Sequence, residues 1–276
     1  MKTPKMRASR TTHYLRTLAS HPEIILGNSK YLFLISHMRS YSTLISHLLG
    51  SSEEINGYKE NHLSYRSTGD LIHLRYRTQQ AIEARLDGTY ILDKILHNHA
   101  EISPKMLKKD TIHILFTIRK PVETVKSIIN MGSKLVDVEW YRDEDQVAGY
   151  YEGRLQKMCE YAKLVGKRGA YLDAEAILNH PEEVVSRLSG WLQLNKPLDT
   201  EYQTFKHSGQ PFHGDPSKNI LEGKIIKKKG SYDIEISTAT ENRVIEAYKE
   251  AKRVIADSCA VLNPIESEAQ KNKVAG

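Results

Sequence analysis

The chain has 276 residues, of which 39% are hydrophobic, and its formal net charge is +6. This length suits one large α/β domain or two small ones, and the basic charge favours an anionic ligand or partner. Its 2 cysteines, with no C-x-x-C pair and no His/Cys cluster, disfavour a disulfide framework and structural zinc.

The chain opens with a polar, basic stretch. Residues 1–29 predict an N-terminal extension, with a short helix around 14–20 and a loop over 22–30. We expect one domain over 30–262 and a frayed tail over 263–276. The opening stretch lacks the apolar core of a signal peptide, and nothing in the sequence approaches the length of a membrane span. We therefore expect a cytoplasmic protein.

A strand, a polar loop and a helix follow over 31–49. Large apolar residues from Tyr31 to Ile35 predict a buried strand, and leucine and isoleucine at 44, 45, 48 and 49 have helical spacing. The loop between them carries Arg39 and several hydroxyl groups. Unpaired N–H groups at a helix N-terminus and a forked guanidinium both favour an anion here. The alternative is an ordinary turn in which Ser42 caps the helix.

Strands and helices alternate along the rest of the chain. The expected strands lie near 53–62 and at 88–93, 112–118 and 169–173. The expected helices span 64–86, 140–165 and 240–261 or begin at Pro104, Pro121 and Pro181, while 195–239 predicts a loop. This alternation indicates a three-layer α/β/α fold with a central parallel sheet.

Charged residues directly follow the expected strands. Arg39, Glu60, Lys94 and Arg119 all have this placement. Ligands of parallel sheets bind at the carboxyl ends of the strands. The sequence therefore predicts that these four side chains share one site.

Two of these strand ends resemble a known family. The loop Arg39-Ser40-Tyr41-Ser42-Thr43 resembles the R-S-G-[ST]-T loop of sulfotransferases that use 3′-phosphoadenosine 5′-phosphosulfate (PAPS). The strand before Arg119, with Ser127 eight residues further on, resembles the 3′-phosphate site of the same family. Tyr41 stands where that family usually has glycine, so we expect either a differently shaped loop or a tyrosine that closes over the ligand.

The resemblance implies a P-loop-kinase-like sulfotransferase fold, with PAPS as co-substrate and no metal. It implies that the loop from Arg39 through Ser40, Tyr41, Ser42 and Thr43 holds the 5′-phosphosulfate. It also implies that Arg119 and Ser127 hold the 3′-phosphate. A late segment, 210–219, looks like the loop that closes over the nucleotide in bacterial sulfotransferases, and Lys218 would be its basic residue.

Two residues are candidates for the base that takes the acceptor proton. The segment Lys59-Glu60-Asn61-His62 looks like the K-E-x-H segment of heparan-type sulfotransferases, in which the glutamate is the base. A carboxylate among cations has a lowered pKa unless it is desolvated, whereas His62 has an ordinary pKa nearer neutrality. Both remain candidates. Lys94 resembles a lysine that many family members place beside the acceptor, and we include it with Arg39 among the catalytic residues.

The predicted function is transfer of a sulfuryl group from PAPS to a hydroxyl or amine of a small molecule, lipid or saccharide. Residues 63–87 and 132–160 would line the acceptor pocket. One alternative, a nucleotide-dependent kinase, lacks the Walker A glycines and lysine and an evident acidic Mg²⁺ ligand. The other, a non-catalytic polyanion- or RNA-binding protein, is disfavoured because the basic residues are dispersed and the run Lys227–Lys229 is short. We expect no nucleic-acid partner, and no feature of the sequence indicates an oligomeric state.

Overall fold

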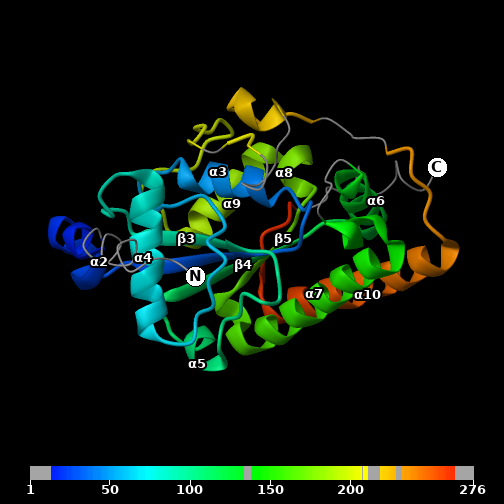
Figure 1. Ribbon diagram of the computed structural model, residues 1–276, viewed down its shortest axis with the longest axis horizontal. Coiled ribbons are helices and arrows are strands. Elements are labelled where there is room, and N and C mark those ends of the chain that lie inside the picture. The colour runs from blue at the N-terminus through cyan, green and yellow to red at the C-terminus, as the bar shows by residue number, and fades with distance from the viewer. Residues whose placement is uncertain (1–13, 134–137, 207, 211–217, 228–231, 265–276) are drawn as a thin grey trace, which may run out of the picture.

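A sheet of six parallel strands forms the centre of the part of the chain described by the computed structural model, residues 14–133, 138–206, 208–210, 218–227 and 232–264 (Figure 1). The strand order is β2-β3-β1-β4-β5-β6, and every pair of neighbours is parallel. The strands are β1 (Lys30–Ile35), β2 (Ile55–Asn56), β3 (Tyr90–Ile95), β4 (Ile112–Ile118), β5 (Ala170–Asp173) and β6 (Ala260–Val261).

Helices cover both faces of this sheet. One face carries α3 (Ser42–Gly50), α8 (Ala176–Asn179) and α9 (Pro181–Leu192) (Figure 1). The other carries α4 (Thr68–Ile82), α5 (Pro104–Leu107), α6 (Pro121–Gly132), α7 (Glu144–Val165) and α10 (Thr238–Ser258).

Alternate strand residues supply the two cores. In β1, Leu32 and Leu34 belong to the α3 side, whereas Phe33 and Ile35 belong to the α4 side. This alternation is the period of a strand that is buried on both faces. The expected three-layer α/β/α fold with a central parallel sheet is confirmed.

Several expected boundaries shift because of local contacts. The helix expected over 64–86 begins at Thr68, where Ser67 and Asp70 form a capping box. The loop expected over 22–30 contains α2 (Glu23–Leu26), whose Ile24 is fully buried in the core.

The end of the chain also differs in detail from the expectation. The helix expected over 140–165 is a 3₁₀ turn, η1 (Glu139–Arg142), followed by α7, because the Asp143 side chain caps α7 by accepting from the Gln146 N–H. The helix expected over 240–261 ends at Ser258, and the chain then enters β6. Among the described residues of 195–239, the loop contains one short 3₁₀ turn, η3 (Lys218–Glu222).

None of the helices in the described ranges combines the length and the apolar character that a membrane crossing requires.

Candidate active site

The loop between β1 and α3 turns through two left-handed residues. Arg39 has φ 62° and Tyr41 has φ 59°. Tyr41 thus adopts the kind of backbone conformation that glycine would adopt at lower cost. It is also the N-cap of α3, so Ser42 is the first helical residue and not the cap that the ordinary-turn alternative assigned to it. The first N–H groups of α3 have no acceptor within the helix and open towards the end of β1.

Arg39 and Arg119 lie side by side. Arg119 Nη1 donates to the Arg39 carbonyl at 2.8 Å, across 80 residues of sequence. Arg39 Nε donates to Ser127 Oγ at 2.9 Å, and the Tyr232 hydroxyl donates to the same oxygen at 2.9 Å. The Arg119 guanidinium also lies 4.6 Å from the centre of the Tyr41 ring. The residues expected at the two ends of the nucleotide therefore come from neighbouring strands into one cluster.

This cluster has more positive than negative charge. Arg119 Nε is buried and has no hydrogen-bond partner among the described residues, with Glu175 Oε1 as its ion pair at 4.0 Å. Burial raises the pKa of Glu175, which weakens that carboxylate as a counter-ion. Burial alone would raise the pKa of Tyr232, but the Ser127 hydrogen bond and the Arg119 and Arg39 charges lower it overall. A buried guanidinium N–H without a hydrogen-bond partner, in a cluster with a second arginine, fits an anionic group.

Ser40 lies beneath the loop in a buried hydroxyl network. Its hydroxyl donates to the His37 carbonyl at 2.6 Å and lies 2.6 Å from Ser36 Oγ. Thr117 Oγ1 in turn donates to Ser36 Oγ at 2.8 Å. The hydroxyl hydrogen of Ser40 is therefore used inside the protein, so the hydroxyls of Ser42 and Thr43 and the backbone N–H groups are better placed as donors to a ligand.

Sequence reasoning missed His37, which fixes Arg119 to the loop. Its Nε2 accepts from the Arg119 backbone N–H at 3.0 Å, and its Nδ1 donates to the Met38 carbonyl at 2.8 Å. Burial lowers the pKa of His37 to about 3, so the ring is neutral and can accept at one nitrogen. Neither bond has a signal in the local sequence, because a histidine in a loop is usually exposed.

Arg154 of α7 was also missed. Its side chain is fully buried and donates to the Ser36 carbonyl at 2.7 Å, to the Ile95 carbonyl at 2.6 Å and to Asn98 Oδ1 at 3.0 Å. These bonds join the carboxyl ends of β1 and β3. The sequence did hold a signal, because an arginine at this position falls on the inward face of the expected helix, next to Leu155.

Glu60 and Lys94 lie on the other side of the loop. The Lys94 ammonium donates to Thr43 Oγ1 at 3.3 Å and is nearly inaccessible to solvent. The Glu60 side chain is 14% exposed, and its Oε1 lies 3.4 Å from Nδ1 of His62, whose side chain is 55% exposed. Burial raises the pKa of Glu60 although the Lys94 charge opposes the shift, and burial lowers the pKa of His62. Desolvation thus makes Glu60 a stronger base than an exposed carboxylate.

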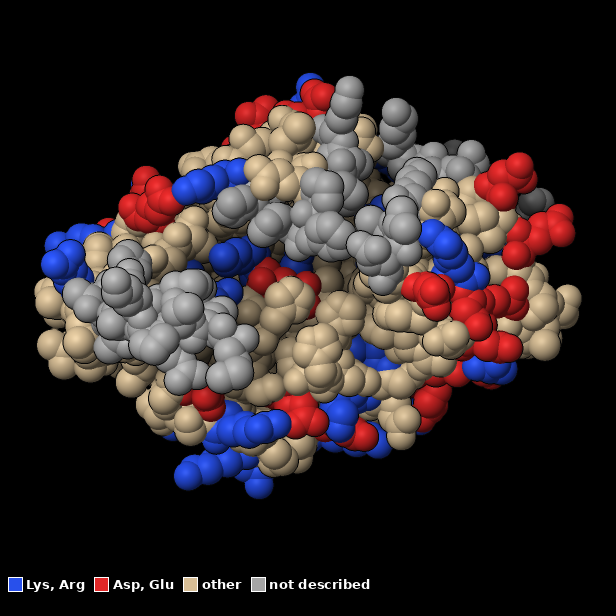
Figure 2. Space-filling view, viewed as in Figure 1, with Lys and Arg blue, Asp and Glu red and all other residues tan. Residues whose placement is uncertain are grey.

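A series of aromatic rings begins at His62, the ion-pair neighbour of this carboxylate. The His62 and His99 rings lie 6.3 Å apart, and the His97 and His99 rings lie 5.3 Å apart. Tyr150 follows at 5.7 Å from His97, and Trp140 at 5.5 Å from Tyr150. Near its middle, the face shown in Figure 2 is hollowed where acidic and basic side chains come close together. No group of three or more metal-ligating side chains with suitable geometry occurs in the described part of the chain.

Part of the predicted nucleotide loop lies outside the described residues. These are residues 211–217 of the late segment and the side chain of Lys218, whose backbone begins η3. A cavity of about 740 Å³ lies elsewhere, at the β2 edge between the ends of α3 and α4, where Tyr58 and Phe205 are among its lining residues. None of the predicted catalytic or nucleotide-binding residues lines it, although its lining includes residues 81–85 of the range 63–87 that was expected to line the acceptor pocket.

The comparisons find structural similarity but no sequence match. No family model matches the sequence, and no curated protein matches it. Among solved structures, the chain is similar to the "Sulfotransferase Domain from the Curacin Biosynthetic Pathway", with a TM-score of 0.46 and 16% sequence identity, over 80% of this chain and 97% of that chain. This similarity is low.

Proposed function

We propose that this protein is a PAPS-dependent sulfotransferase. The observation that carries the proposal is the hydrogen bond from the Arg119 guanidinium to the Arg39 backbone carbonyl, which joins the loops after two adjacent strands beside the N-terminus of α3. Both cations lower the pKa of the Tyr232 hydroxyl, and an anion with phosphate or sulfate groups near that hydroxyl would be stabilised by the same two charges. PAPS would supply the sulfuryl group to be transferred.

The residues divide between two ends of such a nucleotide. Arg39, Ser42, Thr43 and the first N–H groups of α3 would hold the 5′-phosphosulfate, with Tyr41 covering the loop. Arg119 and Ser127 would hold the 3′-phosphate, and Lys218 would close from the late segment. The shared Ser127 contact of Arg39 and Tyr232 supports a single continuous site.

The proposed base is Glu60, with His62 as the alternative. A carboxylate whose pKa is raised by burial takes a proton from a hydroxyl or amine more readily than an exposed one. Lys94, bound to Thr43, is placed between the phosphosulfate loop and this carboxylate, where its charge would stabilise negative charge that develops in transfer. The aromatic rings beside Glu60 would exclude water from the acceptor.

Calorimetric binding of adenosine 3′,5′-bisphosphate tests the nucleotide site. We expect the wild-type protein to bind it without metal and to bind ATP weakly, and we expect Arg39→Ala and Arg119→Ala to weaken binding at least about tenfold. Arg253→Ala, on the exposed face of α10, is the matched control and should bind normally. A preference for ATP that needs Mg²⁺, or binding of heparin alone, would overturn the proposal.

Transfer is tested with radiolabelled PAPS and four acceptors: 4-nitrophenol, 1-dodecanol, methyl glucoside and glucosamine. They represent a phenol, a lipid alcohol, a saccharide hydroxyl and an amine. We expect labelled product from at least one of them, and strongly reduced product with Arg39→Ala. Undiminished transfer by that variant would contradict the role of the loop.

A further inference from the structure

Asp93 of β3 is a fully buried carboxylate that no part of the proposed chemistry uses. Its Oδ1 accepts from the backbone N–H of Asn61 at 2.9 Å and from Asn61 Nδ2 at 3.0 Å. Its Oδ2 accepts a short hydrogen bond from the Tyr65 hydroxyl. Three donors, all from the segment just after Glu60, therefore converge on one side chain that lies 28 to 32 residues away in sequence.

Asp93 and its neighbour Lys94 face opposite sides of the sheet. Successive strand residues alternate in this way, and the contacts agree, since Lys94 reaches Thr43 of α3 whereas Asp93 reaches Asn61. One strand thus holds the phosphosulfate loop with one residue and the segment of the proposed base with the next. The separation between the two segments is set by the rigid backbone of β3.

Tyr65 is itself held from several directions. Its backbone N–H donates to the Glu101 carbonyl at 2.6 Å, and its carbonyl accepts from the Ser103 N–H at 2.9 Å. Its ring centre lies 4.6 Å from that of Phe33, the residue paired with Asp93 in the sheet register. The segment from Asn61 to Tyr65 is therefore anchored at both of its ends.

Between these anchors, the backbone takes an uncommon conformation. His62 has φ 53°, and Glu60, one residue before the Asn61 anchor, keeps a buried Oε1 without a hydrogen-bond partner among the described residues. A buried carboxylate oxygen that accepts no hydrogen bond is costly unless the surrounding structure holds it in place. The hydrogen bonds from Asn61 to Asp93 fix the residue next to Glu60 in the chain and thereby restrain the position of Glu60.

We propose that Asp93 is a positioning residue that holds Glu60 in place as the base, through its bonds to Asn61 and Tyr65. This inference rests on the proposed sulfotransferase function. It predicts that removing the Asp93 acceptors slows proton removal from the acceptor while leaving nucleotide binding intact, because Arg39 and Arg119 lie on other elements.

Two substitutions separate geometry from charge. Asp93→Ala removes every acceptor, whereas Asp93→Asn keeps an oxygen that can accept both Asn61 bonds and places an amide that can donate to the Tyr65 oxygen. We expect Asp93→Ala to lower kcat for the acceptor that wild type sulfates fastest, on the order of 100-fold. Asp93→Asn should restore most of the rate, and both variants should bind adenosine 3′,5′-bisphosphate as wild type does.

A matched pair of tyrosines controls for stability. Tyr65→Phe removes the hydroxyl that donates to Asp93, and Tyr171→Phe removes a buried hydroxyl that donates to Asp173 Oδ1 at 2.5 Å on β5. We expect Tyr65→Phe to lower kcat and Tyr171→Phe to leave it unchanged. Equal effects of the two variants on kcat would overturn the proposal.

Hydrogen exchange gives a readout that does not depend on activity. The Asn61 amide should exchange slowly in wild type and fast in Asp93→Ala, while amides of β1 keep their protection. If that exchange rate rises and kcat stays at the wild-type value, Asp93 does not position the base. A wild-type protein that binds no adenosine 3′,5′-bisphosphate and sulfates no acceptor would instead remove the proposed function, and this inference with it.

Discussion

Tyr41 combines a strained backbone with a useful ring. Its left-handed φ of 59° is a conformation that glycine would adopt without a side-chain penalty, yet its ring stacks on the Arg119 guanidinium at 4.6 Å. The family resemblance left two possibilities for this residue. The structure supports an intermediate answer, in which the loop keeps a backbone turn suited to glycine and the ring covers an arginine of the proposed site.

A pair of variants measures this backbone strain. Tyr41→Gly and Tyr41→Ala both remove the ring, but the left-handed backbone conformation is unfavourable for alanine and not for glycine. We expect Tyr41→Gly to have a free energy of unfolding about 1 kcal/mol higher than Tyr41→Ala. Urea unfolding of the two variants measures the difference, and equal stabilities would argue against the left-handed turn.

Glu60 provides the residue-scale test of the chemistry. We expect Glu60→Gln to lower kcat by about 10²- to 10⁴-fold without weakening the binding of adenosine 3′,5′-bisphosphate. Because burial raises its pKa above the ordinary 4.5, the rate of wild type should fall as pH is lowered towards a midpoint above that value. The loss has this sign because the protonated carboxyl cannot accept a proton. A larger loss in His62→Asn than in Glu60→Gln would assign the base to His62.

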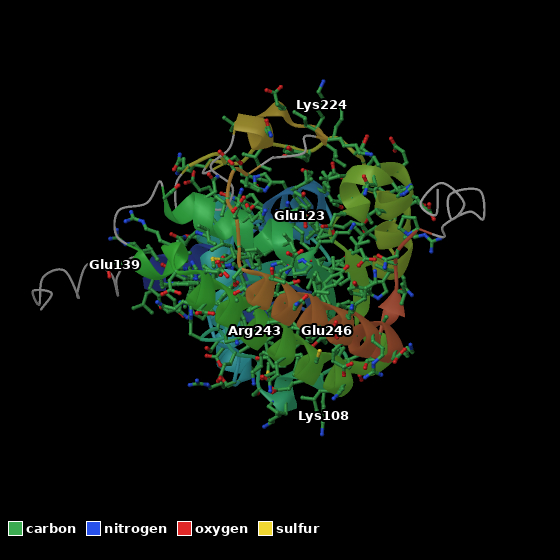
Figure 3. All side chains as sticks on the ribbon, turned by 90° about the vertical axis from the view of Figure 1, so that its right-hand side faces the viewer. Lys108, Glu123, Glu139, Lys224, Arg243 and Glu246 are labelled. Carbon is green, nitrogen blue, oxygen red and sulfur yellow. The ribbon has the colours of Figure 1, made fainter. Side chains whose placement is uncertain are left out.

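At the scale of elements, α10 packs along α7 through both apolar and charged contacts. Val244, Ala251 and Ile255 are buried in the core of this side of the sheet. On the outer surface, Arg243 donates to Asp145 at 3.0 Å and to Glu152 at 2.9 Å, both on α7. Figure 3 shows Arg243 and Glu246 along α10 on the side facing the viewer. The apolar contacts should dominate, because exposed ion pairs are screened and contribute little.

A comparison of two truncations tests this ranking. Ile255→Ala should lower the free energy of unfolding by roughly 2–5 kcal/mol, since it leaves a cavity between α10 and the sheet. Arg243→Ala should have a much smaller effect that shrinks further at high salt. Urea unfolding at low and high ionic strength measures both, and a salt-independent loss in Arg243→Ala as large as that in Ile255→Ala would reverse the ranking.

At the scale of the whole molecule, buried titratable groups have opposite effects on the pH dependence of stability. Burial lowers the pKa of His37 to about 3 and that of His97 to about 4. The folded protein therefore loses stability as the pH falls below 6.5, the pKa of these histidines in the unfolded chain. Burial raises the pKa of Asp93 from 3.8 to about 6. Asp93 therefore adds stability as pH falls through about 6, because the folded state then binds the proton more tightly than the unfolded state.

Asp93→Asn should expose this opposition. Without the Asp93 contribution, the stability loss between pH 7 and pH 5 should be larger than in wild type by about 1 kcal/mol. Urea unfolding of both proteins at the two pH values gives the comparison. A smaller loss in the variant would mean that the Asp93 pKa is not raised.

The sequence predicted most of the fold because most elements have a strong local pattern. Apolar runs marked β1, β3, β4 and β5, and prolines marked the starts of α5, α6 and α9. It missed β6, since two residues after a long helix carry no periodicity. It also missed the break before α7, which depends on a single Asp143 cap.

The candidate site divides in the same way. The contact between Arg39 and Arg119 was predictable because each lies in the loop after a strand, and ends of parallel strands share an edge. His37, Asp93 and Arg154 were missed because their roles depend on contacts across 28 to 118 residues. The residues near them in sequence do not indicate which carbonyl or amide groups become their hydrogen-bond partners.

By itself, the sequence determined the alternation of strands and helices, the two basic strand ends and the carboxylate after the short strand, because these follow from periodicity and order along the chain. Only the tertiary structure decided that Arg119 donates to the Arg39 backbone, that the Ser40 hydroxyl donates to the His37 carbonyl and that Glu60 is desolvated. The reason is physical: hydrogen-bond partners and the dielectric around a charge depend on which distant segments pack together, and that is set by the sheet as a whole.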